Sequence, residues 1–234
     1  ENIKLREEIQ KSEKLKAVAT LAAGMAHEIK NPLTSIKTFT EYLPQKYNDP
    51  DFIEKFNKIV GGEVDRINHI VRQLLEFSRP GKLHAKETNT NKLLDETLSL
   101  LNNDFLKYGI KITRNYSRIP AITSDSAQIK QVFLNLFLNA IDSMKNGGSI
   151  SVRTKQVNYD TISVEIEDAG EGIAKDDIDL IFDPFFSRKD GGTGLGLSVV
   201  LGIIKKHGGK INIKSTLGKG TTFTISLPVK QQTV

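Results

Sequence analysis

The sequence predicts an all-α helical hairpin over residues 1–79, a hinge over residues 80–84 and an α+β sandwich over residues 85–234. In the first part, hydrophobic residues recur at alternating intervals of four and three from Val18 to Leu43. This is the heptad pattern of helices packed along their length. After "SRPGK" at 78–82 the pattern changes, and helical blocks alternate with short strand-like stretches. Helices and mostly antiparallel strands in blocks favour helices on one face of a sheet.

The hairpin follows from two helical runs joined by a turn. "YNDPD" at 47–51 combines the Asn, Asp and Pro typical of turns, and an Asp there can cap the next helix. The second run carries its own apolar stripe, at Ile53, Phe56, Val60, Ile67, Ile70, Leu74 and Phe77. Two helices cannot bury stripes of this width alone, so we expect a homodimer in which two hairpins form a four-helix bundle. Because the chain opens without Met inside a helical pattern, we interpret residues 1–15 as the end of an upstream signalling helix in a longer protein.

The sandwich is predicted element by element from periodicity and turn residues. Helices are expected over 90–105, 126–146 and 195–207, and strands over 110–117, 121–125, 149–157, 161–169, 209–216 and 220–228. The strongest helical signal is "SAQIKQVFLNLFLNAIDSMKNGG". We expect it to be capped near Ser124 or Ser126 and to end at Gly147.

Composition narrows the classes of function. The net charge is +5, with Lys and Arg spread along the chain, which disfavours nucleic-acid binding and fits a nucleotide phosphate or an acidic protein partner. The chain has no cysteine, which excludes disulfides and thiolate zinc sites. It also has no apolar run of the roughly 18–20 residues that a membrane span needs, and no signal peptide. We therefore expect a cytoplasmic catalytic fragment without membrane contact of its own, which is compatible with an inner-membrane anchor elsewhere in a longer protein.

"HEIKNP" at 27–32 presents a histidine with unusual surroundings. It resembles the start of the zinc-protease motif H-E-x-x-H, but Asn31 stands where the second histidine is required. In the heptad frame His27 faces outward, so it does not fill the core. A carboxylate such as Glu28 that accepts a hydrogen bond from Nδ1–H leaves Nε2 as a nucleophile. The alternative is a solvated surface histidine.

Two glycine-rich stretches in the second part suggest a phosphate site. "DAGEGI" at 168–173 follows a strand, and "GGTGLGL" at 191–197 opens a helix whose N-terminus favours anions. Neither stretch matches the P-loop or the dinucleotide fingerprint, and either could be a plain loop. Between them, Phe182, Phe185 and Phe186 in an expected exposed loop precede Arg188 and Lys189, which suggests a hinged lid over a polyphosphate.

A polar stripe lies on the strongest helix. Asn135, Asn139 and Asp142 fall on one face of an otherwise apolar sequence. Oxygen-bearing side chains of this kind suit Mg²⁺, which keeps several of its waters. The alternative is an ordinary solvated face.

With these motifs in view, the chain resembles the catalytic core of a bacterial two-component sensor histidine kinase over residues 15–228. The phosphoacceptor box is "HEIKNPL" at 27–33, the N box "NLFLNAIDSM" at 135–144, and the first glycine box "DAGEGI". The F box is "IFDPFF" at 181–186, the second glycine box "GTGLGL" at 192–197, and the closing strand motif "GKGTTFTISLP" at 218–228. The order and spacing are those of the family, and "FFSRK" is similar to the FFTTK of nitrogen-regulation-type sensors.

The resemblance implies a dimeric phosphoacceptor hairpin and an ATP-binding sandwich of the GHKL (Bergerat) type, shared with gyrase, Hsp90 and mismatch-repair ATPases. It also implies that His27 accepts the γ-phosphoryl group of ATP, which is later passed to an aspartate on a response regulator. Glu28 would orient and activate the histidine. Asn31 matches the residue that in many members positions water for dephosphorylating the regulator.

The resemblance also assigns the nucleotide site, with ATP and Mg²⁺ as the implied ligands. Asn135 would hold Mg²⁺, Asn139 would contact phosphates, and Asp168 would read the adenine amino group. Gly170 and Gly172 would let the base approach, and Lys189 would contact the γ-phosphate. The second glycine box, Gly192, Thr193, Gly194, Leu195 and Gly196, would cradle the phosphates. Some members carry Lys where this chain has Asp142, so that residue is assigned no phosphate role.

Three other readings remain open from sequence. The protein could act mainly as a phosphatase on its regulator, since His27 and Asn31 suit both activities. It could be a nucleotide-gated ATPase clamp that does not phosphorylate itself, although "HEIKNP" disfavours this. A plain coiled-coil dimeriser would bind no nucleotide at all.

Overall fold

The computed structural model describes residues 29–78, 83–184, 186–188 and 194–230. The chain divides into two compact units, with the boundary between Arg79 and Pro80. The upstream segment 1–15 and residues 79–82 of the hinge lie outside the described residues.

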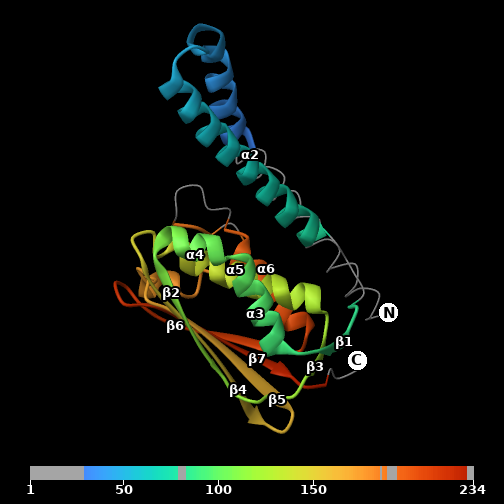
Figure 1. The fold of residues 1–234 in the computed structure, drawn as a ribbon. Helices are drawn as coiled ribbons and strands as arrows, with labels where there is room; N and C mark the ends of the chain where they lie inside the picture. The colour runs from blue at the N-terminus through green and yellow to red at the C-terminus, as the bar shows by residue number, and fades with distance from the viewer. Residues whose placement is uncertain (1–28, 79–82, 185, 189–193, 231–234) are drawn as a thin grey trace. The chain divides into compact units, whose positions relative to one another are not determined.

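The first unit is the expected helical hairpin, drawn in Figure 1 as two neighbouring helices. Its first helix is described over residues 29–46, and its second, α2, spans Pro50–Ser78. Between them Asp49 accepts the backbone N–H groups of Asp51 (3.1 Å) and Phe52 (3.2 Å), which caps the second helix. The rings of Phe39 and Phe52 stack across the hairpin with centroids 6.0 Å apart. The turn therefore has the chemistry that the sequence predicts.

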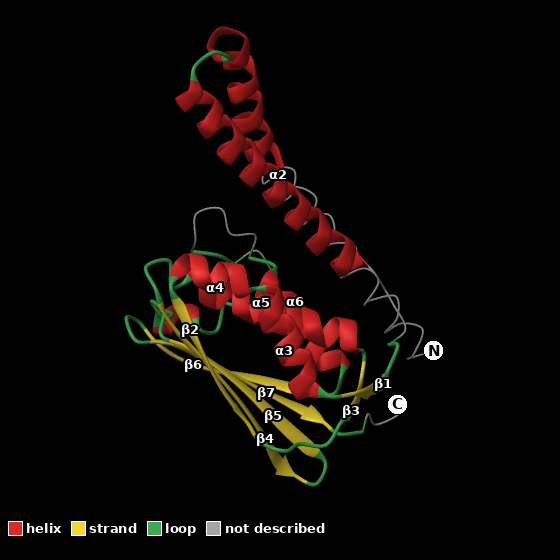
Figure 2. Ribbon diagram, in the orientation of Figure 1, coloured by secondary structure: helices red, strands yellow, loops and turns green. Residues whose placement is uncertain are grey.

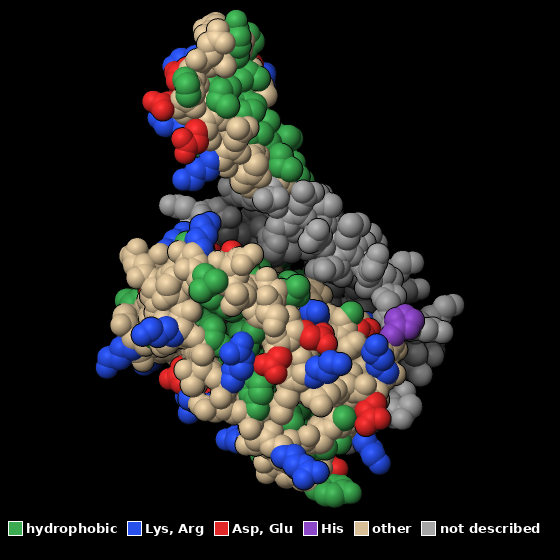
Figure 3. Space-filling view, viewed as in Figure 1, with side chains coloured by type: hydrophobic (Ala, Val, Ile, Leu, Met, Phe, Trp, Pro, Cys, Tyr) green, Lys and Arg blue, Asp and Glu red, His purple; other side chains and the backbone are tan. Residues whose placement is uncertain are grey.

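The apolar stripes of the hairpin occupy its partly buried positions. Those described as half-buried are Ile29, Ile36, Phe39, Leu43, Ile53, Phe56, Val60 and Ile67. Val64 on α2 remains 44% exposed and Leu33 on the first helix 50% exposed, so the hairpin leaves apolar surface uncovered. Figure 3 shows hydrophobic side chains in a row along one side of the hairpin.

The second unit is a layer of helices on one face of a five-stranded sheet, as Figure 2 shows. The strand order is β2-β4-β5-β7-β6, in which β2 and β4 are parallel and the other neighbours antiparallel. The helices are α3 (Thr90–Leu100), α4 (Asn102–Tyr108), α5 (Ser126–Asp142) and α6 (Gly196–Lys206), with a 3₁₀ turn η1 (Lys175–Asp177). The strands of this sheet are β2 (Ile110–Tyr116), β4 (Gly148–Asn158), β5 (Thr161–Asp168), β6 (Lys210–Thr216) and β7 (Gly220–Pro228). A separate two-stranded sheet pairs β1 (Lys86–Thr88) with β3 (Ile122–Ser124).

The core lies between the helices and the sheet. Phe133 and Phe137 of α5 are fully buried, and each contributes about 2–3 kcal/mol of apolar burial. On the sheet, Ile150 and Val152 of β4 point inward, while the next residue, Arg153, lies on the other face and pairs with two glutamates of β5. This alternation is that of a sheet with one covered and one solvated face.

Three helix boundaries differ from expectation. The helix predicted over 90–105 is two helices, because Leu101 leaves helical geometry between α3 and α4. The N-cap of α5 is Asp125, and neither Ser124 nor Ser126: its carboxylate accepts the N–H groups of Ala127 (3.1 Å) and Gln128 (3.2 Å). Ser124 is committed to the β1–β3 ladder, so it cannot turn its side chain to the helix. The helix also ends earlier, with its C-cap at Ser143.

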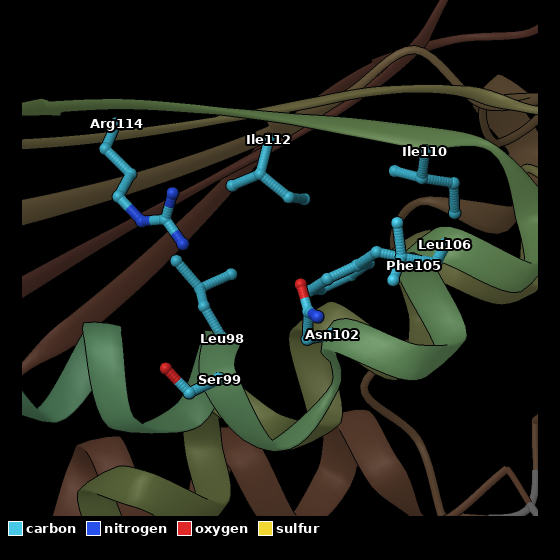
Figure 4. Close-up of a pocket in the computed structure, with 8 residues that line it drawn as sticks. All are labelled: Leu98, Ser99, Asn102, Phe105, Leu106, Ile110, Ile112 and Arg114. Atoms are coloured by element: carbon cyan, nitrogen blue, oxygen red, sulfur yellow. The ribbon is translucent and has the colours of Figure 1, made fainter.

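A hollow of about 400 Å³ opens between the edge strand β2 and helices α3 and α4 (Figure 4). Ile112 and Arg114 of β2 face Leu98 and Asn102 across it. None of its lining residues belongs to the predicted nucleotide site.

Charge is distributed as the sequence predicts on the face drawn in Figure 3, where lysines and arginines alternate with acidic side chains over the second unit. In the described part of the chain, no helix combines the length and the apolar character that a membrane crossing requires.

His207, the C-cap of α6, joins the end of α6 to the start of α5. Its ring is 2% exposed, its Nε2 accepts the backbone N–H of Asp125 (3.1 Å), and its Nδ1 lies 2.8 Å from the carbonyl oxygen of Ile203. Burial lowers the pKa of this imidazole below its ordinary value. The charge of Lys206 lowers the pKa further, whereas the Ile203 carbonyl and the Asp125 carboxylate each raise it by less than burial lowers it. The ring is therefore held neutral in the folded chain.

We expect acid to destabilise the second unit through His207. Its pKa in the folded state lies below the ordinary value of about 6.5, so the unfolded chain takes up the proton first. The stabilisation is complete above about pH 6.5 and is lost as the pH falls through the unfolded pKa toward the folded one. Urea unfolding followed by circular dichroism at pH 7.5 and 5.5 should show a larger loss for the wild-type chain than for His207→Gln, which cannot titrate. Equal losses in the two chains would contradict this assignment.

Candidate functional site

Asp168 ends β5 at a buried position beside helix α5. It is 7% exposed, and its Oδ1 accepts the N–H of Gly170 (2.9 Å) and lies 3.4 Å from the hydroxyl of Ser143, the C-cap of α5. The Gly170 N–H is the main donor that orients this carboxylate oxygen, because the single proton of the Ser143 hydroxyl also lies within reach of the Ala140 carbonyl oxygen at 2.8 Å. A carboxylate oriented in this way can accept a hydrogen bond from the exocyclic amine of a base.

The two glycines after Asp168 are required by the chain's own packing. A Cβ on Gly170 would lie 2.1 Å from the Ser143 hydroxyl oxygen. Gly172 has φ +69°, and a Cβ there would lie 2.1 Å from the carbonyl oxygen of Thr216. The resemblance assigned these glycines to the approach of a base; the structure gives an additional reason, the approach of protein atoms to this turn.

Thr221 is a neighbour of Asp168 that sequence reasoning missed. It pairs with Asp168 in the β5–β7 register and is 6% exposed. The hydroxyl of Ser215 accepts the N–H of Ile173 (2.8 Å) and donates to the carbonyl of Gly220 (3.0 Å). The Thr221 hydroxyl, 2.8 Å from Ser215 Oγ, must therefore donate to it. Thr221 lies 53 positions after Asp168 in the sequence, so no local pattern predicts that the two are neighbours. Only the pairing of β5 with β7 brings them together.

The polar stripe of α5 is partly buried and faces α6. Asn135 is 8% exposed, and its Nδ2 donates to the carbonyl oxygen of Gly196 at 3.3 Å. Because the amide nitrogen is committed there, the carbonyl oxygen is the atom that can bind a cation. Asn139 is half-buried one turn later, whereas Asp142 is exposed. Solvation therefore explains Asp142 but not Asn135.

An amide oxygen at this position fits Mg²⁺, which binds through one or two protein oxygens and completes its shell with waters and phosphate oxygens. Among the described residues there is no cluster of three or more His, Asp or Glu that could hold a metal ion by itself. A magnesium ion at Asn135 would thus take most of its ligands from a nucleotide.

The N-terminus of α6 lies beside Asn135. Leu195, the residue before the helix, is buried, and Gly194 has φ +62°. The N-cap residue, Leu195, makes no side-chain cap hydrogen bond, and the first turn of α6 has no acidic residue. A helix start of this kind favours an anion such as phosphate.

The segment between the glycine stretches differs from the expected exposed loop. Phe182 and Phe186 are half-buried and packed against the core, so the aromatic residues anchor this segment. Arg188 donates from Nη2 (2.9 Å) and Nε (3.3 Å) to the buried carboxylate of Asp177 in η1. Its guanidinium also lies 5.8 Å from the ring centroid of Phe186. The positive charge of Arg188 thus pairs with Asp177, which is not a residue of the predicted nucleotide site.

Comparison with known proteins identifies both units. The family model for the His Kinase A (phospho-acceptor) domain matches residues 17–82. The model for the histidine kinase-, DNA gyrase B- and HSP90-like ATPase matches residues 124–231. The sensor histidine kinase ZraS of Salmonella typhimurium is 40% identical over 227 residues, covering 96% of this chain and 49% of that protein. Sporulation kinase E of Bacillus subtilis is 36% identical, covering 99% and 31%.

A solved structure has the same arrangement of elements. The histidine kinase ThkA, solved in complex with the response regulator protein TrrA, is 30% identical with a TM-score of 0.80, covering 97% of this chain and 66% of that one. The catalytic domain of ThkA alone is 32% identical with a TM-score of 0.58, covering 63% of this chain and 97% of that one. The chain belongs to the sensor histidine kinase family.

The comparisons confirm the predicted family and fold class, a helical hairpin followed by the family's ATPase sandwich. The chain spans about half the length of ZraS and about a third of sporulation kinase E.

The predicted site residues fall into three groups. Asp168, Gly170, Asn135, Asn139 and Gly196 lie in the second unit, around the ends of β5 and α5 and the start of α6, with Gly172, Gly194 and Leu195 in the adjoining turns. Asn31 lies on the first helix of the hairpin and is exposed. The remaining residues, His27, Glu28, Lys189, Gly192 and Thr193, lie outside the described residues.

Gly172 should be intolerant of a side chain. Gly172→Ala combines a strained positive φ with a backbone clash at Thr216, so we expect a loss of at least about 2 kcal/mol of unfolding free energy. The matched control is Gly202→Ala on α6, where an added Cβ meets nothing within 4 Å and a gain of about 0.5–1 kcal/mol is expected. Urea denaturation compares the two. A Gly172→Ala chain as stable as the wild type would show that the turn is not constrained in this way.

Proposed function

We propose that this chain is the catalytic core of a sensor histidine kinase that phosphorylates itself on His27 with MgATP. The phosphoryl group then passes to an aspartate on a response regulator. The observation that carries the proposal is the arrangement in the second unit, where the Asn135 amide, the start of α6 and the oriented Asp168 carboxylate come from segments far apart in sequence. Residues 17–82, which include His27, match the model of a phospho-acceptor domain, which supports His27 as the acceptor of the phosphoryl group.

The proposed binding mode divides the nucleotide among these groups. The oriented carboxylate of Asp168, which lies beside Thr221, would accept a hydrogen bond from the adenine amino group. Asn135 would hold Mg²⁺ through its carbonyl oxygen, and Asn139 would contact the phosphates one turn later. The helix start at Gly196, with Gly192, Thr193, Gly194 and Leu195, would surround the phosphates, and Lys189 would contact the γ-phosphate. Bound Mg²⁺ would neutralise charge on the β- and γ-phosphates.

The proposed transfer step requires little covalent chemistry from the protein. Nε2 of His27 attacks the γ-phosphorus; an N–P bond forms, the bond to the ADP oxygen breaks, and ADP leaves with that electron pair. Glu28 accepts the hydrogen bond from Nδ1–H, which keeps Nε2 unprotonated and stabilises the charge that develops on the ring. Positioning and charge stabilisation account for most of the rate in reactions of this kind.

The partners follow from the hairpin. The exposed Val64 and Leu33 and the half-buried stripes support a homodimer in which a second hairpin covers the apolar surface. ThkA was solved in complex with a response regulator protein, which supports a receiver domain as the phosphoryl acceptor here. The exposed position of Asn31, one turn after His27, supports a second activity, dephosphorylation of that regulator. Because the reaction consumes ATP, the proposed compartment is the cytoplasm.

His27 should carry the label from γ-labelled ATP. Incubation of the chain with labelled ATP and Mg²⁺ should give acid-labile, base-stable label, and His27→Ala should abolish it. The matched control is His84→Ala, which removes an exposed imidazole and should keep the label. Label that persists in His27→Ala would refute the assignment. ATP hydrolysis without any label would favour the ATPase clamp, and absence of nucleotide binding would favour a plain dimeriser.

Asn135 should be needed for the magnesium-dependent reaction. We expect Asn135→Ala to lower the labelling rate by about 10²-fold or more, since positioning of the transferred group is lost, while light scattering still reports a dimer. Asn115→Ala, an exposed amide on the edge strand β2, is the matched control and should label normally. Normal labelling in Asn135→Ala would exclude the proposed magnesium role.

A further inference from the structure

Helices α5 and α6 run antiparallel and are hydrogen-bonded to each other at two points. At one end the Asn135 amide of α5 donates to the carbonyl of Gly196, at the start of α6. At the other end the N–H of Asp125, the N-cap of α5, donates to Nε2 of His207, the C-cap of α6. At a rise of 1.5 Å per residue the two points are about 15 Å apart along α5 and about 16 Å apart along α6. The two spacings agree, so the bonds can form together only in one axial register.

The contact at His207 requires one tautomer. Because the N–H of Asp125 donates to Nε2, that nitrogen must be unprotonated. The proton of the neutral ring is then on Nδ1, where it donates to the Ile203 carbonyl at 2.8 Å. Both ring nitrogens are satisfied, and a ring that is 2% exposed has no water to replace either bond.

Asp125 also receives the segment that enters the second unit from the hinge. Its Oδ2 accepts the N–H of His84 at 3.2 Å, just before β1 pairs with β3. Burial opposes ionisation of this carboxyl, but the N–H groups of Gln128, His84 and Ala127 lower its pKa below the ordinary value. The start of α5, the end of α6 and the chain arriving from the hairpin thus meet at Asp125 and His207.

We propose that His207 is a positioning residue of the nucleotide site, which it serves from the far end of the two helices. Its bond to Asp125 sets the axial register of α5 against α6, and thereby the position of the Asn135 amide relative to the helix start at Gly196. The inference rests on the proposed function, in which those two groups bind Mg²⁺ and phosphate. Loss of this bond should weaken MgATP binding even though His207 touches no ligand.

A matched pair of variants separates this role from a purely structural one. In His207→Gln the side-chain oxygen replaces Nε2 and can still accept the N–H of Asp125, while the bond to Ile203 is lost. In His207→Asn the amide nitrogen replaces Nδ1 and can still donate to Ile203, while the bond to Asp125 is lost. Each variant loses one buried hydrogen bond, so a structural role predicts similar destabilisation and similar binding in both.

The readout is calorimetric titration of each full chain with Mg²⁺ and a non-hydrolysable ATP analogue. We expect His207→Asn to bind roughly three- to ten-fold more weakly than His207→Gln, the factor that corresponds to one ordinary hydrogen bond. His207→Gln should stay close to the wild type. Equal affinities in the two variants, or weaker binding in His207→Gln, would overturn the proposal.

Hydrogen exchange without nucleotide tests the helix register independently of the proposed function. The N–H of Val199 donates to Leu195 in the first turn of α6. Peptides covering this turn should exchange faster in His207→Asn than in His207→Gln. Unchanged exchange would refute the coupling between the two ends of α6. An exchange difference between the two variants, together with a wild-type chain that binds no nucleotide, would instead refute the proposed function alone.

Discussion

The burial of helix α5 is the constraint on which the rest of the second unit depends. One face of this helix carries Phe133 and Phe137, which are fully buried in the core. Placing them there costs no backbone adjustment, because the apolar residues already recur at helical spacing. The same rotation about the helix axis turns Asn135 toward the start of α6. The polar contact between the two helices is thus a consequence of the packing that forms the core.

Hydrogen bonds at the ends of helices then fix the axial position of α6 along α5, which apolar packing leaves less well determined. Apolar attraction is non-directional, so it constrains the axial position of α6 along α5 less sharply than hydrogen bonds do. Directional bonds at Gly196 and at His207 remove that remaining freedom. At the end of β5, Ser143 and Thr216 lie so close to Gly170 and Gly172 that a Cβ at either glycine would clash, so this turn excludes side chains at both positions.

The two units also differ in how completely they bury their own apolar side chains. The sandwich encloses a fully buried apolar core between one sheet face and the helices, and its exposed apolar residues are scattered, mostly over helix ends and turns, as at Leu106, Tyr159 and Leu217. Its other sheet face is solvated and held by pairs such as Arg153 with Glu165. The hairpin has only two helices, so its stripes stay half-buried and Val64 stays exposed. A layer needs a second layer to complete a core. This contrast is why the dimer proposal concerns the hairpin and not the sandwich.

Much of this was present in the sequence. The heptad spacing before Leu43, the turn at residues 47–51 and the type of most elements followed from local patterns, because amphipathic periodicity and turn chemistry are properties of neighbouring residues. The family followed from the resemblance of the ordered motifs. The polar stripe at Asn135 and Asn139 was also visible, although only the structure separates it from the exposed Asp142. The cap at Asp125 was misplaced by one position, since the competing Ser124 is engaged in a strand pairing that no local pattern reveals.

Tertiary structure alone decided the contacts that join distant segments. Thr221 lies opposite Asp168, Arg188 binds Asp177, and His207 accepts from Asp125. These partners are set by strand register and by the packing of helices on the sheet, neither of which is encoded in the spacing of residues along the chain. The sequence determined which elements form and which residues can do chemistry. The fold determined which of those residues are held together, because directional bonds across long separations form only after the core has fixed the positions of their backbones.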